Sequence, residues 1–264
     1  MTLISEPILL LFRNRRTLFA SLILEGRQSY AGSAGGVAWL FVGPVALMAI
    51  YVAIYALVLR VSVPGLSTYQ YISALVVGLG AFIGFAQGLS NGMSSLLANK
   101  NVLLNTVYPA ELLAPKSSIL SSVVILIGAC VAVVIVGFSD GASATWVILP
   151  LLLVAQILFT TGIAYVLSVV SIAVRDIQFA TAYVIICLMI ASPIAYRPEM
   201  VPDALAIVLY INPLSYFIIA YQDAVLGHWP SIGTSLAVFG LSTFSFLGGA
   251  TFFRATKRAI ADRL

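Results

Sequence analysis

Charged residues are scarce in this sequence. Asp, Glu, Lys and Arg make up only 8% of its 264 residues, while hydrophobic residues make up 61%. A soluble domain carries about 25% charged residues, so a globular protein surrounded by water is excluded. The composition instead predicts a chain whose surface lies mostly in lipid.

The residue patterns of several functional sites are also missing. A single histidine, His228, and the lack of an acidic cluster argue against a metal site. No glycine is followed by lysine, so the chain has no phosphate-binding P-loop of its own. The two cysteines, Cys130 and Cys187, lie in apolar runs, where we expect small packing residues rather than a redox pair. We therefore predict no catalytic residue, no metal and no directly bound cofactor.

Long uncharged runs are what the sequence contains instead. About 20 apolar residues cross the roughly 30 Å hydrocarbon core of a bilayer. The runs without Asp, Glu, Lys or Arg are 37–59, 61–99, 117–139, 141–174, 177–196, 204–222 and 224–253. They predict an all-α polytopic membrane protein. Ion-coupled transporters usually keep some charges in mid-span, so any transport by this chain is expected to draw its energy from elsewhere, such as a partner ATPase.

Charge distribution predicts the orientation. With a cytoplasmic N-terminus, all but two of the 13 Lys and Arg residues fall inside, leaving Arg60 and Arg197 outside. This one-sided usage follows the positive-inside rule, so the excess positive charge reports orientation rather than nucleic-acid binding. Both termini are predicted to be cytoplasmic, which requires an even number of spans. The six predicted spans are 37–59, 69–90, 118–138, 145–174, 177–195 and 233–253.

The run 204–222 is long enough to span but is predicted not to cross. A seventh crossing would place the basic C-terminal residues outside. Asn212-Pro213 interrupts the run, and Pro213 removes a backbone donor and restricts the residue before it. Because non-helical backbone at membrane depth must be covered by protein or water, we predict that 196–232 forms an external re-entrant element.

Two segments outside the spans have apolar patterns of their own. The stretch 8–34 mixes apolar residues with arginines and predicts a helix lying in the cytoplasmic interface. A plain lead-in with ordinary positive-inside arginines is the alternative. The segment 99–114, flanked by Lys100 and Lys116, predicts a short amphipathic helix. It would dock into a groove on another protein, or rest on the membrane surface.

Small and aromatic residues within the spans raise two further questions. Gly80, Gly84, Gly88 and Gly92 share one helix face and allow close approach of a second helix. That helix belongs either to the same chain or to another subunit. A group of aromatic residues is a candidate lining for a path that sugars follow, because sugar C–H faces stack on rings; contact with lipid or other helices is the ordinary alternative. The group is Tyr51, Tyr55, Phe82, Phe85 and Tyr165.

Five motifs, taken in order, resemble a known family. They are YAGSAGGVAWLFVGP (30–44), VYPAELLAP (107–115), VRDIQ (174–178), SPIAY (192–196) and INPLSYFIIAYQDAVLGHWP (211–230). Their order and spacing resemble the ABC-2 type permeases of bacterial polysaccharide exporters, which move O-antigen, capsular polysaccharide or teichoic acid. Two positions depart from the family pattern. Asn105-Thr106-Val107 stands where a basic residue is frequent, and Gln222 stands where arginine is common.

The resemblance implies a single ABC-2 type transmembrane domain over 1–264 in the bacterial inner membrane. It implies a homodimer joined to two copies of a nucleotide-binding subunit, which would hold the ATP and magnesium. The substrate would be a lipid-linked polysaccharide, and periplasmic and outer-membrane export proteins are further candidate partners. The permease itself would not be an enzyme.

The resemblance also assigns roles to residues. The expected ATPase contacts are Lys100, Asn101, Leu103, Tyr108, Glu111, Leu112, Arg175 and Asp176. The expected outer gate comprises Pro193, Tyr196, Asn212, Pro213, Tyr216 and Tyr221. The expected junction of the interface helix with the first span comprises Arg27, Tyr30, Gly32, Ser33, Gly36 and Trp39.

Two other functions remain open from the sequence. The first is an ABC-2 exporter of drugs or other small molecules. The second is a membrane-embedded acyl- or glycosyltransferase, which would need acid–base residues near the membrane surface. The outside candidates for that chemistry are Asp140, Glu199, Asp203, Asp223 and His228, for which solvated loop charge is the favoured explanation.

Overall fold

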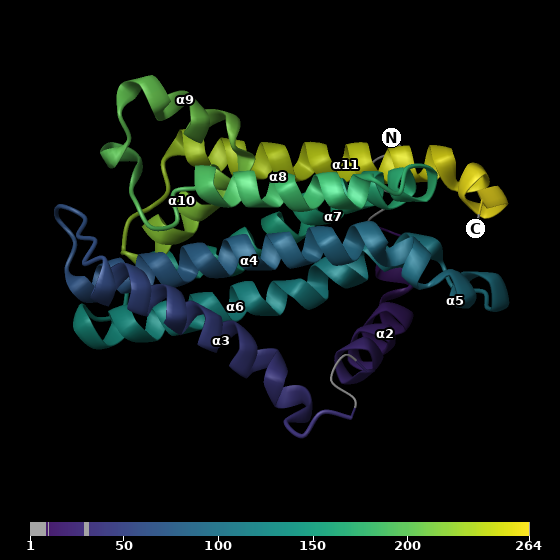
Figure 1. Cartoon of the computed structure of the whole chain (residues 1–264), viewed down its shortest axis with the longest axis horizontal. Coiled ribbons are helices and arrows are strands. Elements are labelled where there is room, and N and C mark those ends of the chain that lie inside the picture. Colours follow the sequence, from purple (N-terminus) through teal and green to yellow (C-terminus); the bar gives the residue numbers. More distant parts are fainter. Residues whose placement is uncertain (1–8, 10, 29–31, 264) are drawn as a thin grey trace.

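The structure, a computed structural model, describes residue 9 and residues 11–28 and 32–263 (Figure 1). Its regular elements within these ranges are helices. The main ones are α2 (Arg15–Gln28), α3 (Trp39–Val52), α4 (Thr68–Ala98), α5 (Lys100–Asn105), α6 (Leu113–Ser139), α7 (Leu149–Ala173), α8 (Ile177–Ala191), α9 (Asp203–Ile211), α10 (Pro213–Val225) and α11 (Ile232–Arg263).

Helix length and composition confirm the membrane class. Within the described residues, five helical segments are long and apolar enough to cross a bilayer: Trp39–Val58, Thr68–Ala98, Ala110–Ser139, Ala144–Ala173 and Ile232–Lys257. The first is α3 extended by a π-helical turn over Ala53–Val58. The chain is therefore a multi-pass membrane protein.

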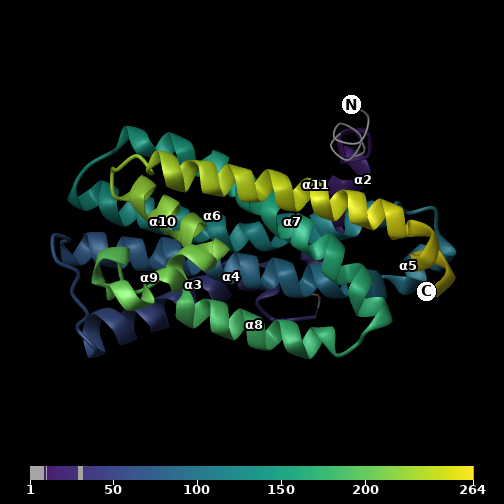
Figure 2. The same ribbon diagram turned by 90° about the horizontal axis from the view of Figure 1, so that it is seen from above.

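Two elements do not fit a simple span. Helix α8 has 15 residues, or about 22 Å at 1.5 Å per residue, which is shorter than the expected span 177–195. Helices α9 and α10 meet at Asn212 with a bend of 89°, as in a broken span or a re-entrant loop. Helices α9 and α10 lie at the same end of the bundle in Figures 1 and 2.

Helix α4 forms the centre of the bundle and packs against α6, α7 and α10. In its most apolar window 78% of the residues are buried, compared with 6% for Trp39–Val58. Figure 1 shows α3 leaving the bundle at an angle, with its N-terminal end far from α4. Figure 2 shows α8 and α11 on opposite sides of the bundle. The core thus surrounds α4, while α3 and α8 are peripheral.

The glycines of α4 account for this close packing. A Cβ atom on Gly84 would lie 2.4 Å from Cγ1 of Ile125 in α6. One on Gly92 would lie 2.6 Å from Cβ of Ala164 in α7. Because no real side chain fits at such distances, the glycine face is used for packing within the chain rather than between subunits.

The structure differs from the expected boundaries at the C-terminal end of α4. The expected span ended at 90, but α4 continues to Ala98. The segment 99–114 is not one helix: α5 ends at Asn105, Thr106 is extended, and α6 begins at Leu113. Pro109 explains the break, because it disfavours helical backbone at the residue before it. The other shifts are smaller, with α2 covering 15–28 of the expected 8–34 and α11 extending to Arg263.

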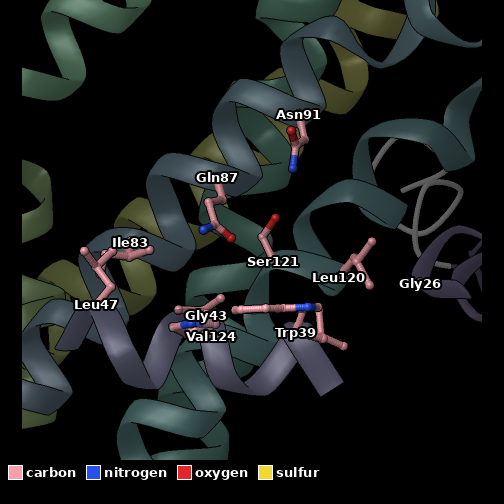
Figure 3. A pocket seen from close by; sticks show the side chains of 12 residues that line it. Gly26, Trp39, Gly43, Leu47, Ile83, Gln87, Asn91, Leu120, Ser121 and Val124 are labelled. Carbon is pink, nitrogen blue, oxygen red and sulfur yellow. The ribbon is translucent and has the colours of Figure 1, made fainter. Parts of the chain in front are cut away.

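The divergence of α3 leaves a wedge beside α4 and α6. A cavity of about 380 Å³ occupies this wedge, with Gly26 of α2 at its rim (Figure 3). The two ends of the bundle are named below by their short helices. The α5 end carries α5 and the C-terminal end of α11, and the α9 end carries α9 and the loop before α4 (Figure 1).

Candidate functional site

Side-chain hydrogen bonds hold the break between α9 and α10. The Asn212 side-chain oxygen accepts a hydrogen bond from the backbone N–H of Leu214 at 3.0 Å and so caps α10. Its amide nitrogen donates to Oγ of Ser192 at 2.9 Å, just after α8 ends. The bend is therefore attached to the end of α8 by a residue that is itself buried.

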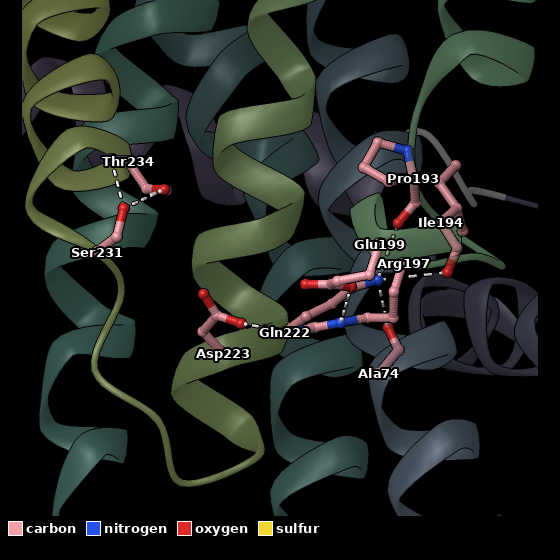
Figure 4. A network of polar contacts seen from close by, with 9 residues as sticks. All are labelled: Ala74, Pro193, Ile194, Arg197, Glu199, Gln222, Asp223, Ser231 and Thr234. Atoms are coloured by element: carbon pink, nitrogen blue, oxygen red, sulfur yellow. Dashed lines mark hydrogen bonds and ion pairs between the residues drawn. The ribbon is translucent and has the colours of Figure 1, made fainter. Parts of the chain in front are cut away.

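Gln222 ties α10 to the segment that follows α8 (Figure 4). Its Nε2 donates to the carbonyl oxygens of Pro193 and Ile194 at 3.0 and 3.3 Å. The carbonyl oxygen of Ala74 in α4 lies 3.4 Å from the same nitrogen. Gln222 is fully buried, so these contacts are protected from water and fix three segments relative to one another.

An ion pair adds a second attachment next to Gln222. Arg197 Nη2 lies 3.1 Å from Oδ1 of Asp223, and both side chains are mostly buried. The exposed carboxylate of Glu199 lies 3.8 Å from Nε of Arg197. Removing one partner of a buried pair leaves an uncompensated charge, which is strongly unfavourable. Gln222, Arg197 and Asp223 are called the α10 clamp below.

The expected outer-gate residues have different environments. Tyr196 and Tyr216 are half-buried, and their hydroxyls donate to the carbonyls of Ala191 and Tyr210. Tyr221 is 1% exposed and belongs to the core, so in this conformation it cannot contact a substrate. The remaining gate residues, Pro193, Asn212 and Pro213, meet at the junction of α8 and α10.

Sequence reasoning missed the α10 clamp. In the sequence, Gln222 stands out only as a departure from the arginine that is common in the family. Arg197 is a loop charge there, and Asp223 is a loop charge or an acid–base candidate. The signal in the sequence was a pair of opposite charges, Arg197 and Asp223, on either side of the uncharged, proline-interrupted run 204–222.

The α5 end presents an exposed surface and a buried connection. Lys100 and Asn101 are exposed, as are the apolar side chains of Leu104 and Val107. Leu103 is half-buried and packs on the core cluster at this end. The surface over 100–107 thus mixes exposed apolar and polar residues, as in a surface that contacts another protein.

Three side-chain contacts attach the following segment to other helices. The hydroxyl of Tyr108 lies 3.2 Å from that of Ser21 in α2. Glu111 forms an ion pair with Lys257 of α11. The Tyr165 hydroxyl of α7 donates to the Glu111 carbonyl oxygen at 2.6 Å.

A fourth contact lies close by, since Lys116 Nζ in α6 lies 2.6 Å from Oε2 of Glu25 in α2. A displacement of the segment 108–116 would therefore also move α2, α7 and α11.

The expected ATPase contacts divide by exposure. Arg175 and Asp176 are exposed in the turn between α7 and α8, at the α5 end (Figure 1). Glu111 and Leu112 are buried, so these two cannot touch another protein in this conformation. The correction has a simple cause: Glu111 and Leu112 form the turn that joins α6 and point into the bundle, rather than continuing the exposed face of α5.

Three of the five expected channel-lining residues lie in the core. Phe82, Phe85 and Tyr165 are each at most 3% exposed. Phe85 stacks on Phe159 with ring centroids 5.7 Å apart, because α4 is buried on most of its circumference. All three pack within the chain in this structure, and their place in a channel stays a prediction.

The other two residues of that group lie at the edge of the bundle. Tyr51 and Tyr55 are half-buried and stack on each other at 6.3 Å. The Tyr51 hydroxyl lies 4.0 Å from Sδ of Met189 in α8. They are the members of the aromatic group that remain near a surface.

The described residues of the junction before α3 are mostly exposed. Gly32 and Gly36 adopt positive φ angles of 82° and 49°, which favour glycine. Ser33 Oγ accepts from the backbone N–H of Gly36 at 3.0 Å. Arg27 and Trp39 are exposed, and Tyr30 lies outside the described residues.

Comparison with known proteins identifies the chain's relatives. Residues 17–226 match the ABC-2 type transporter family. The chain is 23% identical over 259 residues to the O-antigen export system permease protein RfbA of Myxococcus xanthus, covering 96% of this chain and 97% of that protein. It is 27% identical over 230 residues to a protein of the same name from Klebsiella pneumoniae, covering 83% and 86%. The chain therefore belongs to the ABC-2 type transporter family.

Proposed function

We propose that the chain is the permease subunit of an ATP-driven exporter that moves a lipid-linked polysaccharide, of the O-antigen or capsular type, across the bacterial inner membrane. The observation that carries this proposal is the similarity to O-antigen export permeases, which extends over nearly the full length of the chain. The bundle of long apolar helices supports a membrane path. The exposed surface over 100–107 supports the proposal that a partner subunit docks there and supplies the energy.

The orientation follows from charge. Lys100, Arg175 and Lys257 lie at the α5 end, whereas Arg60 and Arg197 belong to loops at the α9 end. Positive charge is enriched on the cytoplasmic side of membrane proteins. The α5 end therefore faces the cytoplasm, both termini are cytoplasmic, and α9 with α10 forms the external re-entrant gate.

The coupling route starts at the exposed cytoplasmic surface. A nucleotide-binding subunit, which holds ATP and magnesium, docks on 100–107 and on the Arg175-Asp176 turn. Its movement reaches α11 through Glu111 and Lys257, and α2 through Lys116 and Glu25. The contacts are between side chains of separate helices, so a shift of α5 moves several helices at once.

Two copies of the chain enclose the path in this proposal. Helices α3 and α8 are largely exposed on their own, with Tyr183 and Ile190 of α8 at 70% and 74%. Between them lies one side of the central helix α4 (Figure 1). A homodimer joined along α3 and α8 places these half-covered helices around a shared channel, and movement of α10 against its clamp opens the outer end.

The transferase alternative finds no support in the geometry. Asp223 and Glu199, two of its acid–base candidates, are engaged by Arg197. Two strings match a G-x-S-x-G pattern: GLSNG, residues 88–92, lies inside α4, and GFSDG, residues 137–141, lies at the C-terminal end of helix α6 rather than after a strand. A nucleophile elbow needs a sharp turn between a strand and a helix.

Purification of the tagged chain in mild detergent tests the assembly. We expect a complex of two permease copies and two ATPase copies, measured by native mass spectrometry. Deletion of the gene tests the substrate. Loss of surface glycan with unchanged drug sensitivity supports the proposal, whereas intact surface glycan with increased drug sensitivity favours a small-molecule exporter.

A further inference from the structure

The cavity in the wedge between α3, α4 and α6 has a mostly apolar wall with a cluster of polar side chains on one side (Figure 3). Gln87 and Asn91 of α4 and Ser121 of α6 reach it from one side, and Trp39 of α3 lines the other. Leu47 of α3 and Ile83 of α4 complete its apolar part. An amphipathic ligand would match this division.

The polar groups of the cavity have no side-chain hydrogen-bond partners among the described residues. The hydroxyls of Ser117, Ser118 and Ser122 donate to backbone carbonyls within their own helix. Ser121 makes no such bond, although it is only 4% exposed. Gln87 and Asn91, one turn apart on α4, are exposed to the cavity. Unpaired polar groups in a lipid environment are unfavourable, so these groups favour an occupant that forms hydrogen bonds.

The walls select the chemistry of that occupant. Among the described residues that line the cavity there is no Lys, Arg, Asp or Glu. A phosphate would be recognised by Arg or Lys, so a charged headgroup is a poor match. Two carboxamides and a hydroxyl can both donate to and accept from vicinal hydroxyl groups. The ring of Trp39, which is 49% exposed, offers an apolar face to the C–H side of a sugar ring.

The depth of the cavity places it near one membrane surface. Gln87 lies 19 residues beyond Thr68, at the α9 end of α4, which is about 28 Å along the helix axis. Trp39 begins α3, and tryptophan is enriched at membrane interfaces. In the proposed orientation, the cavity opens at the headgroup level of the cytoplasmic leaflet, beside Gly26 of α2.

We propose that this cavity binds an uncharged sugar residue of the lipid-linked glycan before it enters the channel. The proposal rests on the proposed function and adds to it a recognition site on the cytoplasmic side. Gln87, Asn91 and Ser121 bind the sugar hydroxyls, and Trp39 stacks on its ring. Leu47 and Ile83 contact apolar C–H groups of the same sugar.

Photocrosslinking in cells tests the site with the intact exporter. A photoreactive phenylalanine analogue, p-benzoylphenylalanine, replaces Leu47 in the cavity wall. As a control, the same analogue replaces Phe244, which is exposed on α11. We expect a glycan-bearing adduct at position 47 and none at 244. The adduct must disappear in cells that lack the first glycosyltransferase of glycan synthesis.

Two substitutions test the polar groups. The double variant Gln87→Leu/Asn91→Leu is expected to lower the yield of the glycan adduct about tenfold, since two hydrogen bonds are lost. The matched control is Thr243→Leu, which removes an exposed hydroxyl from α11 and leaves the yield unchanged.

Several outcomes would overturn the inference. Equal adducts at positions 47 and 244, a phospholipid adduct that persists without glycan synthesis, or an undiminished yield in the double variant would each do so. The comparison of crosslinking at positions 47 and 244 uses a chain with native Gln87 and Asn91. It therefore still tests the proposal if the double variant misfolds. Failure of the proposed function looks different, because gene deletion would then leave surface glycan unchanged.

Discussion

At the scale of single residues, the glycines of α4 determine how closely the central helices pack. We expect Gly84→Val to lower the free energy of unfolding by about 1–3 kcal/mol, because the added atoms collide with Ile125. Thermal unfolding in detergent, followed by fluorescence-detected gel filtration, measures the shift. Gly240→Val in α11 is the matched control, since a Cβ there meets nothing within 4 Å. An equal loss in both variants would contradict the packing account.

The ion pair between Glu111 and Lys257 is a second residue-scale test. Glu111 is nearly buried and Lys257 is 57% exposed, so we expect a coupling energy of about 1 kcal/mol, between the exposed and buried cases. A double-mutant cycle with Glu111→Gln and Lys257→Met measures it from thermal stability. Additive effects of the two substitutions would show that the pair does not link the coupling segment to α11.

Residue burial is where prediction from sequence was weakest. Tyr221 and Tyr196 follow similar apolar patterns, yet one is fully buried and the other is half-buried. In a membrane protein, apolar side chains face both lipid and core, so periodicity does not separate the two environments. The burial of Phe82 and Phe85 was missed for the same reason. By contrast, Asn212-Pro213 was recognised as a break because its cause is local.

At the scale of elements, α5 should carry the contact with the ATPase. Leu104→Glu places a charge on an exposed apolar position of α5, and Val107→Glu does so just after the helix ends. We expect both variants to remain in the membrane but to lose stimulation of ATP hydrolysis by the permease. Co-purification of the ATPase and its hydrolysis rate are the measurements.

Leu112→Glu distinguishes contact from folding. Leu112 is fully buried, so a charge there is expected to remove the protein from the membrane rather than uncouple it. A well-folded Leu112→Glu variant, or normal coupling in Leu104→Glu, would refute this assignment.

The α10 clamp is the element that should hold the outer gate closed. Asp223→Asn removes the charge that pairs with Arg197 and should loosen the segment 193–199. A cysteine at position 194 reports on this, because Ile194 is 8% exposed. If the loss of the ion pair costs the closed state about 1 kcal/mol, the open state becomes about fivefold more populated. We therefore expect Ile194→Cys to react at least about fivefold faster with a membrane-impermeant thiol reagent when Asp223 is replaced. The experiment needs Cys130 and Cys187 replaced by Ala. An unchanged labelling rate would count against a clamp.

Element boundaries show how far charge-free runs can guide prediction. The runs located all long helices, because each must be apolar to lie in lipid. The run 61–99 covers α4 to Ala98, but the span expected within it ended at 90, because polar residues follow from Asn91. The segment after α5 was misjudged because a break at Pro109 and a turn at Glu111 depend on packing against α7 and α11.

At the scale of the whole molecule, the peripheral helices α3 and α8 are the feature that a single chain does not explain. Helix α3 with its extension is long enough to span a membrane, and α8 is shorter but apolar. The rest of the chain covers little of either helix, whereas α4 between them is mostly buried. A homodimer with a shared channel gives these helices a partner. Cysteine crosslinking between exposed α8 positions, such as Tyr183, is expected to yield a dimer in membranes. Absence of crosslinks from both α3 and α8 would exclude this arrangement.

The most direct test of the central claim is where the lipid-linked glycan accumulates when the chain is absent. The measurement compares surface glycan and cytoplasmic-side lipid-linked glycan in deletion cells and in cells complemented with the intact gene. The account predicts loss of surface glycan, accumulation of its lipid-linked form inside, and restoration by the gene. Normal surface glycan in the deletion cells, with no accumulation inside, would contradict it.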